Sequence, residues 1–422
     1  MLQEAKDLQK NAVTKLTKIL QNVSDSRKEI TFKAPTGSGK TYMMADFMNR
    51  IICADRNAVF IVSTLSKSNL AAQNFNSFKE LSENGTFADI NPFLINSDSS
   101  GEGSLFIPLE YNVYVLPRDL YKDSSKLKKE GTFVNFLSSL TGDTFMKNPQ
   151  KKLYLIKDEC HIATSNLDEL KEYFCAVINF SATPKLSRKQ EPDVEISNAE
   201  AENAKLIKKV EAGNENDSLE CALMKFEKIR SDYINQLDVN PCFIIQISNK
   251  EKAEEELKNT IMPALQNQQE LKWVYINDKG GETNDSGLKK LPLVKWKDYL
   301  KGKASSISVI IFKMVISEGW DIPRACMLYQ IRDSKSKQLD EQVMGRVRRN
   351  PRLLDFENLS DEAKQLACTA WIWGMIPKEE NLPKQVRLCT DYKVEENFRI
   401  TPVKILSPQK TKNPDMKKIL DN

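Results

Sequence analysis

Histidine is almost absent from this sequence, which has one His in 422 residues, and its eight cysteines include no Cys-x-x-Cys pair. Cysteines scattered in this way argue against a zinc ribbon and a disulfide framework, and they favour a reducing cytoplasm. No apolar run approaches the roughly 18 residues of a membrane span, and the polar N-terminal residues lack the apolar core of a signal peptide. The sequence therefore predicts a cytoplasmic protein with no membrane partner.

Net charge is also small, at +4, although 28% of the residues are charged and 40% are hydrophobic. These proportions are typical of globular proteins, and the length allows two or three domains, each with its own core. So small a net charge is no evidence for a nucleic-acid partner, which would have to bind in a local groove.

Short apolar runs rich in Val, Ile, Phe and Tyr alternate with longer helical patterns. The first set lies at 29–33, 58–63, 112–116, 153–157 and 177–181, and the second at 242–247, 272–276, 307–312 and 327–331. Strands that alternate with helices predict parallel sheets covered on both faces. We therefore expect an α/β fold of two domains, joined by a charged connection from about 185 to 238. A polar, glycine-rich segment at 278–287 predicts a flexible loop.

A glycine-rich segment stands between the first apolar run and a helical pattern at 42–53, and it runs Ala-Pro-Thr-Gly-Ser-Gly-Lys-Thr over residues 34–41. Its two glycines allow backbone N–H groups to turn towards phosphates at a helix N-terminus, where the helix dipole favours anions. The lysine would supply positive charge to the β- and γ-phosphates, and the last threonine would ligate Mg²⁺. An ordinary Gly-Ser turn is the alternative. The predicted nucleotide-binding residues are Thr36, Gly37, Ser38, Gly39, Lys40 and Thr41.

Two adjacent carboxylates, Asp158 and Glu159, follow another apolar run almost directly. Asp158 would hold Mg²⁺, and Glu159 would orient or deprotonate the water that attacks the γ-phosphate. Most such pairs are solvated strand ends, but a place after a buried strand favours the catalytic interpretation. His161, the single histidine, is positioned to sense the γ-phosphate. The sequence thus predicts ATP and Mg²⁺ as cofactors.

Three arginines lie close together in the segment Gly345-Arg-Val-Arg-Arg349. They could form a solvated face. The alternative that we favour is that Arg346 and Arg349 reach across the cleft between two domains as arginine fingers, which stabilise the charge of phosphoryl transfer.

In this order, the phosphate loop, Asp-Glu-Cys-His at 158–161, Ser-Ala-Thr at 181–183 and Gln-x-x-Gly-Arg-x-x-Arg at 342–349 resemble a superfamily 2 helicase. Residues 158–161, 316–323 and 342–351 resemble the helicase subunit of type III restriction enzymes, over about residues 8–352. The resemblance implies two tandem RecA-like domains with the ATP site in the cleft between them, and an ATP-driven helicase or translocase in restriction or phage defence.

With this resemblance we divide the chain into four parts. Residues 1–190 form the ATP-binding domain, 191–238 a charged connecting segment, 239–360 the second RecA-like domain, and 361–422 a C-terminal extension. Trp371 and Trp373 in the extension are expected to pack against the second domain.

The resemblance also assigns roles to single residues. Gln9 would contact the adenine, Gly319 and Asp321 would lie where ATP and nucleic acid meet, and Gln342 would help bind the nucleotide. Nucleic acid would cross both domains opposite the ATP cleft, along Ser63, Thr64 and Gln73. Basic segments add Lys122, Lys128 and Lys335, with Tyr121 free for stacking, although such charge runs are more often solvated faces.

In the family that this sequence resembles, the motor is followed by a nuclease domain with a Pro-Asp…Glu/Asp-x-Lys site. No such pattern follows Arg349 in this sequence. We therefore expect that this chain does not cleave DNA. We expect DNA as its partner, and a methyltransferase or nuclease subunit as a further partner. Two alternatives stay open: an RNA helicase, since the ATP motifs do not distinguish the sugar, and an ATP-dependent switch that recruits such a partner.

Overall fold

The computed structural model describes residues 2–22, 28–65, 70–96, 107–142, 150–160, 165–186, 190–213, 218–248, 251–268, 270–277, 280–313, 322–331 and 343–374. The chain divides into two units, Met1–Pro377 and Lys378–Asn422, and every described residue belongs to the first unit. No helix within these residues is both long and apolar enough to cross a membrane.

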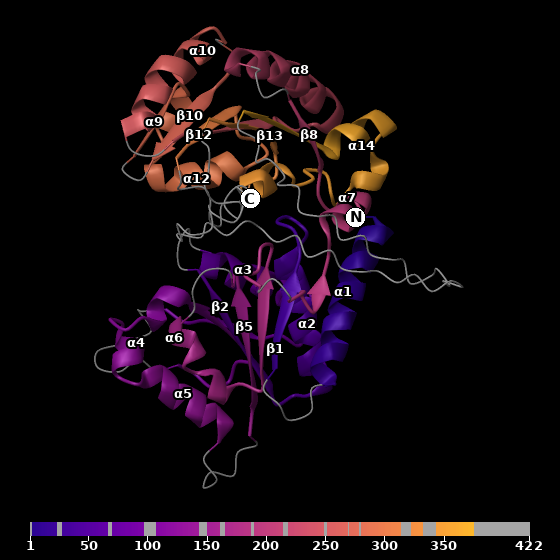
Figure 1. Cartoon of the computed structure of the whole chain (residues 1–422), viewed down its shortest axis with the longest axis vertical. Coiled ribbons are helices and arrows are strands. Elements are labelled where there is room, and N and C mark those ends of the chain that lie inside the picture. The colour runs from indigo at the N-terminus through magenta and orange to yellow at the C-terminus, as the bar shows by residue number, and fades with distance from the viewer. Residues whose placement is uncertain are drawn as a thin grey trace, which may run out of the picture. The chain divides into compact units, whose positions relative to one another are not determined.

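The first sheet has seven strands in the order β3-β4-β2-β5-β6-β1-β7, and all of its pairs are parallel (Figure 1). Its strands are β1 (Lys28–Lys33), β2 (Ala58–Thr64), β3 (Pro92–Leu94), β4 (Val113–Pro117), β5 (Lys152–Asp158), β6 (Ala176–Ser181) and β7 (Val194–Glu195). The helices are α1 (Gln3–Gln21), α2 (Lys40–Ala54), α3 (Leu70–Glu83), η3 (Arg118–Tyr121), α4 (Lys126–Lys129), α5 (Thr132–Thr141), α6 (Ser165–Asp168), η4 (Lys171–Tyr173) and α7 (Asn198–Asn203).

Strand β2 shows why this sheet is covered on both faces. All seven of its residues are buried, and successive side chains point to opposite faces of the sheet. Phe60 and Val62 pack in one core with α1, α2 and α3, whereas Val59 and Ile61 pack in another with α4 and α5. In Figure 1, α1 and α5 accordingly lie on opposite sides of the sheet.

The second sheet has the order β11-β10-β12-β9-β13-β14-β8, and only the β10–β11 pair is antiparallel. Its strands are β8 (Lys209–Ala212), β9 (Cys242–Gln246), β10 (Trp273–Asn277), β11 (Gly280–Thr283), β12 (Val309–Phe312), β13 (Ala325–Gln330) and β14 (Thr369–Gly374). The helices are α8 (Leu219–Leu237), α9 (Glu251–Glu256), the π-helical η5 (Leu257–Ile261), α10 (Met262–Gln266), α11 (Ser286–Lys289), α12 (Leu293–Lys301), η7 (Phe356–Asn358) and α14 (Asp361–Ala367).

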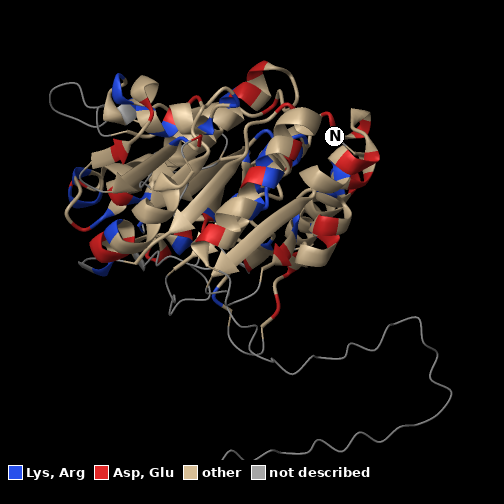
Figure 2. Cartoon of the chain, turned by 90° about the horizontal axis from the view of Figure 1, so that it is seen from above, with Lys and Arg blue, Asp and Glu red and all other residues tan. Residues whose placement is uncertain are grey.

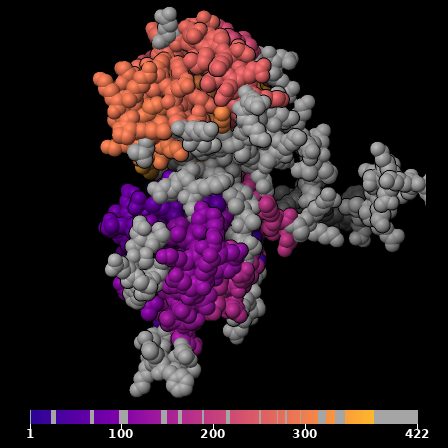
Figure 3. Space-filling view, turned by 90° about the vertical axis from the view of Figure 1, so that its left-hand side faces the viewer, coloured from indigo at the N-terminus to yellow at the C-terminus, as the bar shows by residue number. Residues whose placement is uncertain are grey.

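This sheet also separates two cores, because Phe243 and Ile245 of β9 pack with α8 and α14 while Ile244 packs with α12. Each sheet thus has its own apolar interior. Figure 3 shows one face of the surface that covers them, coloured by residue number. The expected pair of helix-covered, largely parallel sheets is confirmed.

Two parts that we predicted to lie outside the sheets supply strands to them. The charged connecting segment gives β7 to the first sheet and β8 to the second, and its helix α8 buries an apolar face. The C-terminal extension gives α14 and β14 to the second sheet. Trp371 and Trp373 on β14 are each 8% exposed and belong to the core, which confirms their predicted packing.

The prediction of a flexible loop at 278–287 is wrong, because residues 280–283 form β11, which pairs with β10. Main-chain hydrogen bonding to β10 orders this polar strand, although its sequence has little strand propensity. Gly281 is required there, since a β-carbon would come within 2.5 Å of the Trp296 ring.

Lys208, at the start of β8, is a fully buried amine whose Nζ donates to the Ala325 carbonyl at 2.9 Å. Desolvation lowers its pKa from 10.5 to about 8. Because the unfolded chain then binds more protons between about pH 8 and 10.5, Lys208 makes stability rise with pH across this window.

We therefore expect Lys208→Met to gain stability relative to the parent at pH 7, and to lose most of this advantage by pH 10. The difference between the two pH values should be about 3 kcal/mol, since one pKa unit corresponds to about 1.4 kcal/mol. Denaturant unfolding of both proteins at each pH measures it. A parent–variant difference that does not change with pH would contradict a depressed lysine pKa.

Candidate functional site

Polar residues gather where four neighbouring strands of the first sheet end. Thr64 ends β2, Asp158 ends β5 and Ser181 ends β6, while the glycine-rich loop follows β1. The Ala34 amide donates to the Ser181 carbonyl at 3.2 Å and so ties this loop to the neighbouring strand. The carboxyl edge of a parallel sheet is where ligands bind in open α/β folds, so this edge is the candidate site.

The glycine-rich loop has the backbone that its sequence predicts. Gly37 and Gly39 have φ of +92° and +86°, which L-residues with side chains rarely adopt. Gly39 caps α2, so the free N–H groups of the first helical turn face the loop. Ser38 is fully buried and donates through Oγ to the Pro35 carbonyl at 2.8 Å.

Gln9 on α1 lies against this loop, since its Nε2 donates to the Ser38 carbonyl at 2.8 Å. A β-carbon on Gly39 would come within 2.5 Å of the same nitrogen, so the end of the Gln9 side chain would have to move for a larger residue to fit there. The Gln9 Oε1 atom is buried and has no hydrogen-bond partner among the described residues. Gln9 therefore offers an unused acceptor beside the loop.

Lys40 and Thr41 begin α2 on the inner side of the loop. The Lys40 amine lies 3.4 Å from both the Ala34 and Pro35 carbonyls, so it is folded over the loop. The Thr41 Oγ1 atom lies 3.5 Å from Asn74 Oδ1, at the outer limit of a hydrogen bond. Both side chains thus point towards the strand edge.

Asp158 is buried beneath these groups, where Asn74 and Thr64 donate to its Oδ2 at 3.0 and 3.3 Å. Burial raises the pKa of its carboxyl, and the neighbouring charge of Glu159 adds to this shift. The Asn74 hydrogen bond and the charge of Lys40 act in the opposite direction and favour the carboxylate. A bound cation would favour it further, as expected of a metal ligand.

Glu159 follows in an uncommon backbone conformation, with φ of +52°. The peptide carbonyl that precedes it, on Asp158, accepts a 2.6 Å hydrogen bond from Arg118 Nη2. The next amide, of Cys160, donates to Phe180 on β6 at 3.2 Å. Burial raises the pKa of the Cys160 thiol to about 11, so this thiol is protonated at neutral pH.

The arginine segment contacts the same loop. A β-carbon on Gly345 would come within 2.5 Å of the Thr36 side chain, and one on Gly37 would lie 3.2 Å from Arg349 Cγ. Arg346 is 7% exposed. The structure therefore brings Gly345 and Arg349 to the candidate site, and Arg346 follows Gly345 directly in the chain.

Arg348 turns the other way, and its guanidinium donates to Asn198 Oδ1 at 3.0 Å and Glu202 Oε1 at 2.5 Å on α7. Its backbone carbonyl accepts from the Lys208 amide at 2.6 Å, and Ile207 and Arg349 form a β-bridge. These bonds fix the segment to the residues between the two sheets.

Several residues predicted to bind nucleic acid are buried or half-buried. Ser63 and Thr64 are fully buried, and Thr64 contacts Asp158, so neither side chain lies on a surface track. Tyr121 is 3% exposed and packs on Phe133, which makes the predicted stacking role wrong. Gln73 is half-buried.

Lys122 and Lys128, which we predicted to bind nucleic acid, are both in ion pairs. Lys122 pairs with Asp119, and Lys128 pairs with Asp123 and Glu169. Seen from above, Lys and Arg residues are interspersed with Asp and Glu over the ribbons (Figure 2). Other predicted site residues lie outside the described ones, namely His161, Gly319, Asp321, Lys335 and Gln342.

Two residues of the site were not predicted. Asn74 carries no sequence signal, because nothing distinguishes it from other asparagines nearby. Arg118 directly follows an apolar strand, and Asp158 ends one, so this position at the end of a strand is a usable signal. The neighbouring lysines make the same stretch read as a basic surface segment.

The residues present fit a nucleoside triphosphate and Mg²⁺. The loop combines two positive-φ glycines, a helix N-terminus and an inward lysine, which together suit phosphate. Thr41 and Asp158 offer the hydroxyl and carboxylate oxygens that Mg²⁺ prefers, and Asn74 contacts both.

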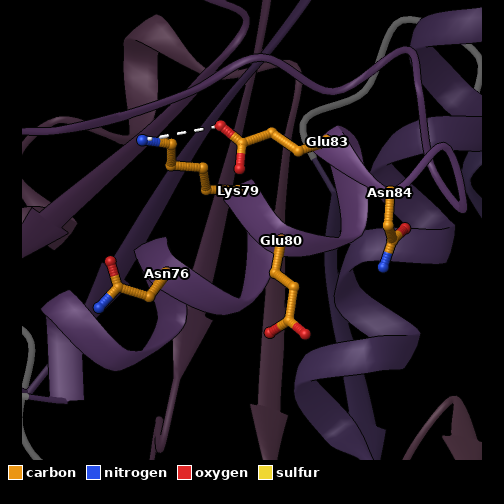
Figure 4. A pocket seen from close by; sticks show the side chains of 5 residues that line it. All are labelled: Asn76, Lys79, Glu80, Glu83 and Asn84. Carbon is orange, nitrogen blue, oxygen red and sulfur yellow. Dashed lines mark ion pairs between the residues drawn. The ribbon is translucent and has the colours of Figure 1, made fainter.

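We expect Asn74→Ala to raise the Mg²⁺ concentration needed for nucleotide binding by about 10-fold or more, as is usual when a residue that orients a metal ligand is lost. A fluorescent ATP analogue titrated at a series of Mg²⁺ concentrations measures this. The matched control is Asn76→Ala on the same helix, in a surface pocket with Lys79, Glu80, Glu83 and Asn84 (Figure 4). Equal Mg²⁺ requirements for both variants would refute the role of Asn74.

Part of the chain that contains this site matches a known family model. Residues 3–186 match the family model described as type III restriction enzyme, res subunit. No curated protein matches the chain in sequence.

Three solved structures are similar to this chain. The type ISP restriction-modification enzyme LlaBIII bound to DNA has 13% identity and a TM-score of 0.50, over 90% of this chain and 28% of that chain. A putative HsdR subunit fragment of a type I restriction enzyme from Vibrio vulnificus has 15% identity and a TM-score of 0.49, over 86% and 63%. S. cerevisiae Dbp5 bound to Gle1 and IP6 has 14% identity and a TM-score of 0.49, over 90% and 87%.

This chain thus spans less than two thirds of the two restriction proteins. The likeness to LlaBIII supports the fold, and the family match covers the phosphate loop and both carboxylates. Residues 3–186 thus match the type III restriction enzyme res-subunit model, and the chain has an α/β fold with two RecA-like domains.

Proposed function

We propose that this chain is a DNA-stimulated ATPase that moves along DNA, acting in the cytoplasm in restriction or phage defence. The observation that carries the proposal is the contact of the arginine segment with the phosphate loop, with Gly345 on Thr36 and Arg349 on Gly37. When residues of both domains complete one site, hydrolysis depends on how one domain is placed against the other. A motor requires this dependence.

DNA is preferred to RNA as the track for two reasons. Residues 3–186 match a family of restriction subunits, and LlaBIII, which has a similar fold, is bound to DNA in its solved structure. We keep 1–190 and 239–360 as the bodies of the two domains, and we add α8, β8 and β14 to the second domain.

Within the site, Gln9 would accept from the adenine amino group through its unused Oε1. Backbone N–H groups of the loop and the Lys40 amine would bind the phosphates. Mg²⁺, when bound, supplies positive charge to the phosphate oxygens, and Thr41 and Asp158 would hold it.

Glu159 would accept a proton from the attacking water, or orient that water, while the water oxygen forms a bond to the γ-phosphorus. The bond to the β,γ-bridging oxygen then breaks, and ADP keeps that oxygen. Arg346 and Arg349 would offset the charge that develops during transfer. His161, Gly319, Asp321 and Gln342 keep their predicted roles at this site.

Steady-state ATP hydrolysis tests the proposal when it is measured without nucleic acid, with single-stranded DNA, with duplex DNA and with RNA. We expect stimulation by DNA that Lys40→Ala abolishes. Stronger stimulation by RNA would identify an RNA helicase instead. Slow hydrolysis unaffected by any nucleic acid would favour a switch that recruits a nuclease or methyltransferase subunit.

A further inference from the structure

Arg118 is the first residue of the basic segment and lies at the carboxyl edge of the first sheet, where the candidate site is. It begins η3 directly after β4, and its side chain is partly buried, unlike the exposed Lys122 that follows. Strand β4 pairs with β2, which pairs with β5, so the carboxyl ends of β4 and β5 lie two strands apart at the same edge. A long side chain is needed to cross this distance.

The guanidinium holds one particular peptide group. Its Nη2 donates at 2.6 Å to the Asp158 carbonyl, which belongs to the peptide plane between Asp158 and Glu159. The torsion about the bond from the Glu159 nitrogen of this peptide to its α-carbon is φ, and here φ is +52°. The hydrogen bond therefore acts directly on the torsion that aims the Glu159 side chain.

A positive φ must be stabilised by other interactions, because the left-handed region costs a residue with a β-carbon about 1–2 kcal/mol. Among the described residues, the other non-glycine residues with positive φ are Lys205 and Asp238, which lie outside the site. A hydrogen bond from a charged donor contributes about 1.5–3 kcal/mol, which is enough to offset this cost.

We infer that Arg118 is a positioning residue for Glu159, which holds the Asp158–Glu159 peptide in the orientation that aims the general base at the attacking water. This inference rests on the proposed ATPase function. Arg118 would then affect the rate of the chemical step, while nucleotide binding depends on the loop, Lys40 and Thr41.

The test compares Arg118→Met, which keeps the length of the side chain without its donors, with Arg118→Lys, which keeps the charge and one donor. The matched control is Arg56→Met, since Arg56 is exposed and pairs with Asp89 on the surface of the same domain. For each protein, kcat with saturating DNA, the Kd of a fluorescent ATP analogue and Tm are measured.

We expect Arg118→Met to lower kcat by about 10- to 100-fold, the usual cost of a small misplacement of a catalytic group, with nucleotide Kd within about 2-fold. Arg118→Lys should recover part of the loss, and Arg56→Met should match the parent. In a Glu159→Gln background, single-turnover rates should show no further loss from Arg118→Met, because both changes remove one function.

Three results would overturn the inference: an unchanged kcat in Arg118→Met, a loss of kcat matched by an equal loss of nucleotide binding, or full additivity with Glu159→Gln. A lower Tm shared by Arg118→Lys, without recovery of kcat, would also assign Arg118 to folding alone. If the parent itself hydrolyses no ATP with any nucleic acid, the proposed function fails, and the inference that rests on it falls too.

Discussion

Replacing Glu159 by glutamine is expected to lower ATP turnover by about 10²- to 10⁴-fold, the usual contribution of a general base. Glutamine keeps the size of the side chain and its backbone conformation but cannot accept the proton of the attacking water. Nucleotide binding should persist, because the loop and Asp158 are unchanged. Single-turnover hydrolysis together with binding of a fluorescent ATP analogue separates these two effects.

The control for this variant is Glu172→Gln, an exposed glutamate of the same domain, on η4. It should hydrolyse ATP at the parental rate. A fully active Glu159→Gln enzyme would remove Glu159 from the chemical step and would require another base at this edge.

Arg349→Ala is expected to lower kcat by about 10³- to 10⁵-fold, as the loss of an arginine finger does in related phosphoryl-transfer enzymes. Alanine keeps the β-bridge of its backbone with Ile207, so the segment should stay in place. The side chain that lies against Gly37 is lost, and with it the charge that would offset the transition state. Steady-state kinetics with saturating DNA and Mg-ATP measure the effect.

Arg348→Ala provides the comparison, because its guanidinium is held by Asn198 and Glu202 on α7 rather than by the loop. It should lower Tm through the loss of these bonds and reduce kcat far less than Arg349→Ala. Equal losses of kcat in both variants, or parental turnover in Arg349→Ala, would contradict the finger assignment.

The strands that build the site could be predicted from the sequence because they are buried on both faces. Such strands form continuous runs of apolar residues, as in β2 and β6, where no residue is exposed. The phosphate loop was also predictable, since the glycines at 37 and 39 occupy positions where φ must be positive.

The edge strands could not be predicted in the same way. Strands β3, β7, β8 and β11 are two to four residues long and polar or partly exposed, so only pairing with a neighbour defines them. Tertiary context thus overrides weak local propensity at the margins of both sheets.

Asn74 and Arg118 were missed because their roles depend on contacts between distant parts of the chain. Each meets Asp158 only after β2, β4 and β5 have paired. A charge run of lysines beside Arg118 favoured a surface interpretation, although its position directly after an apolar strand distinguishes it from these lysines.

Movement along DNA driven by ATP hydrolysis is tested by displacement of a third strand bound to a duplex ahead of the protein. We predict displacement by the parent with ATP, none with a non-hydrolysable analogue, and none by Glu159→Gln. DNA-stimulated hydrolysis without displacement of the third strand, at any distance from the loading site, would contradict a motor.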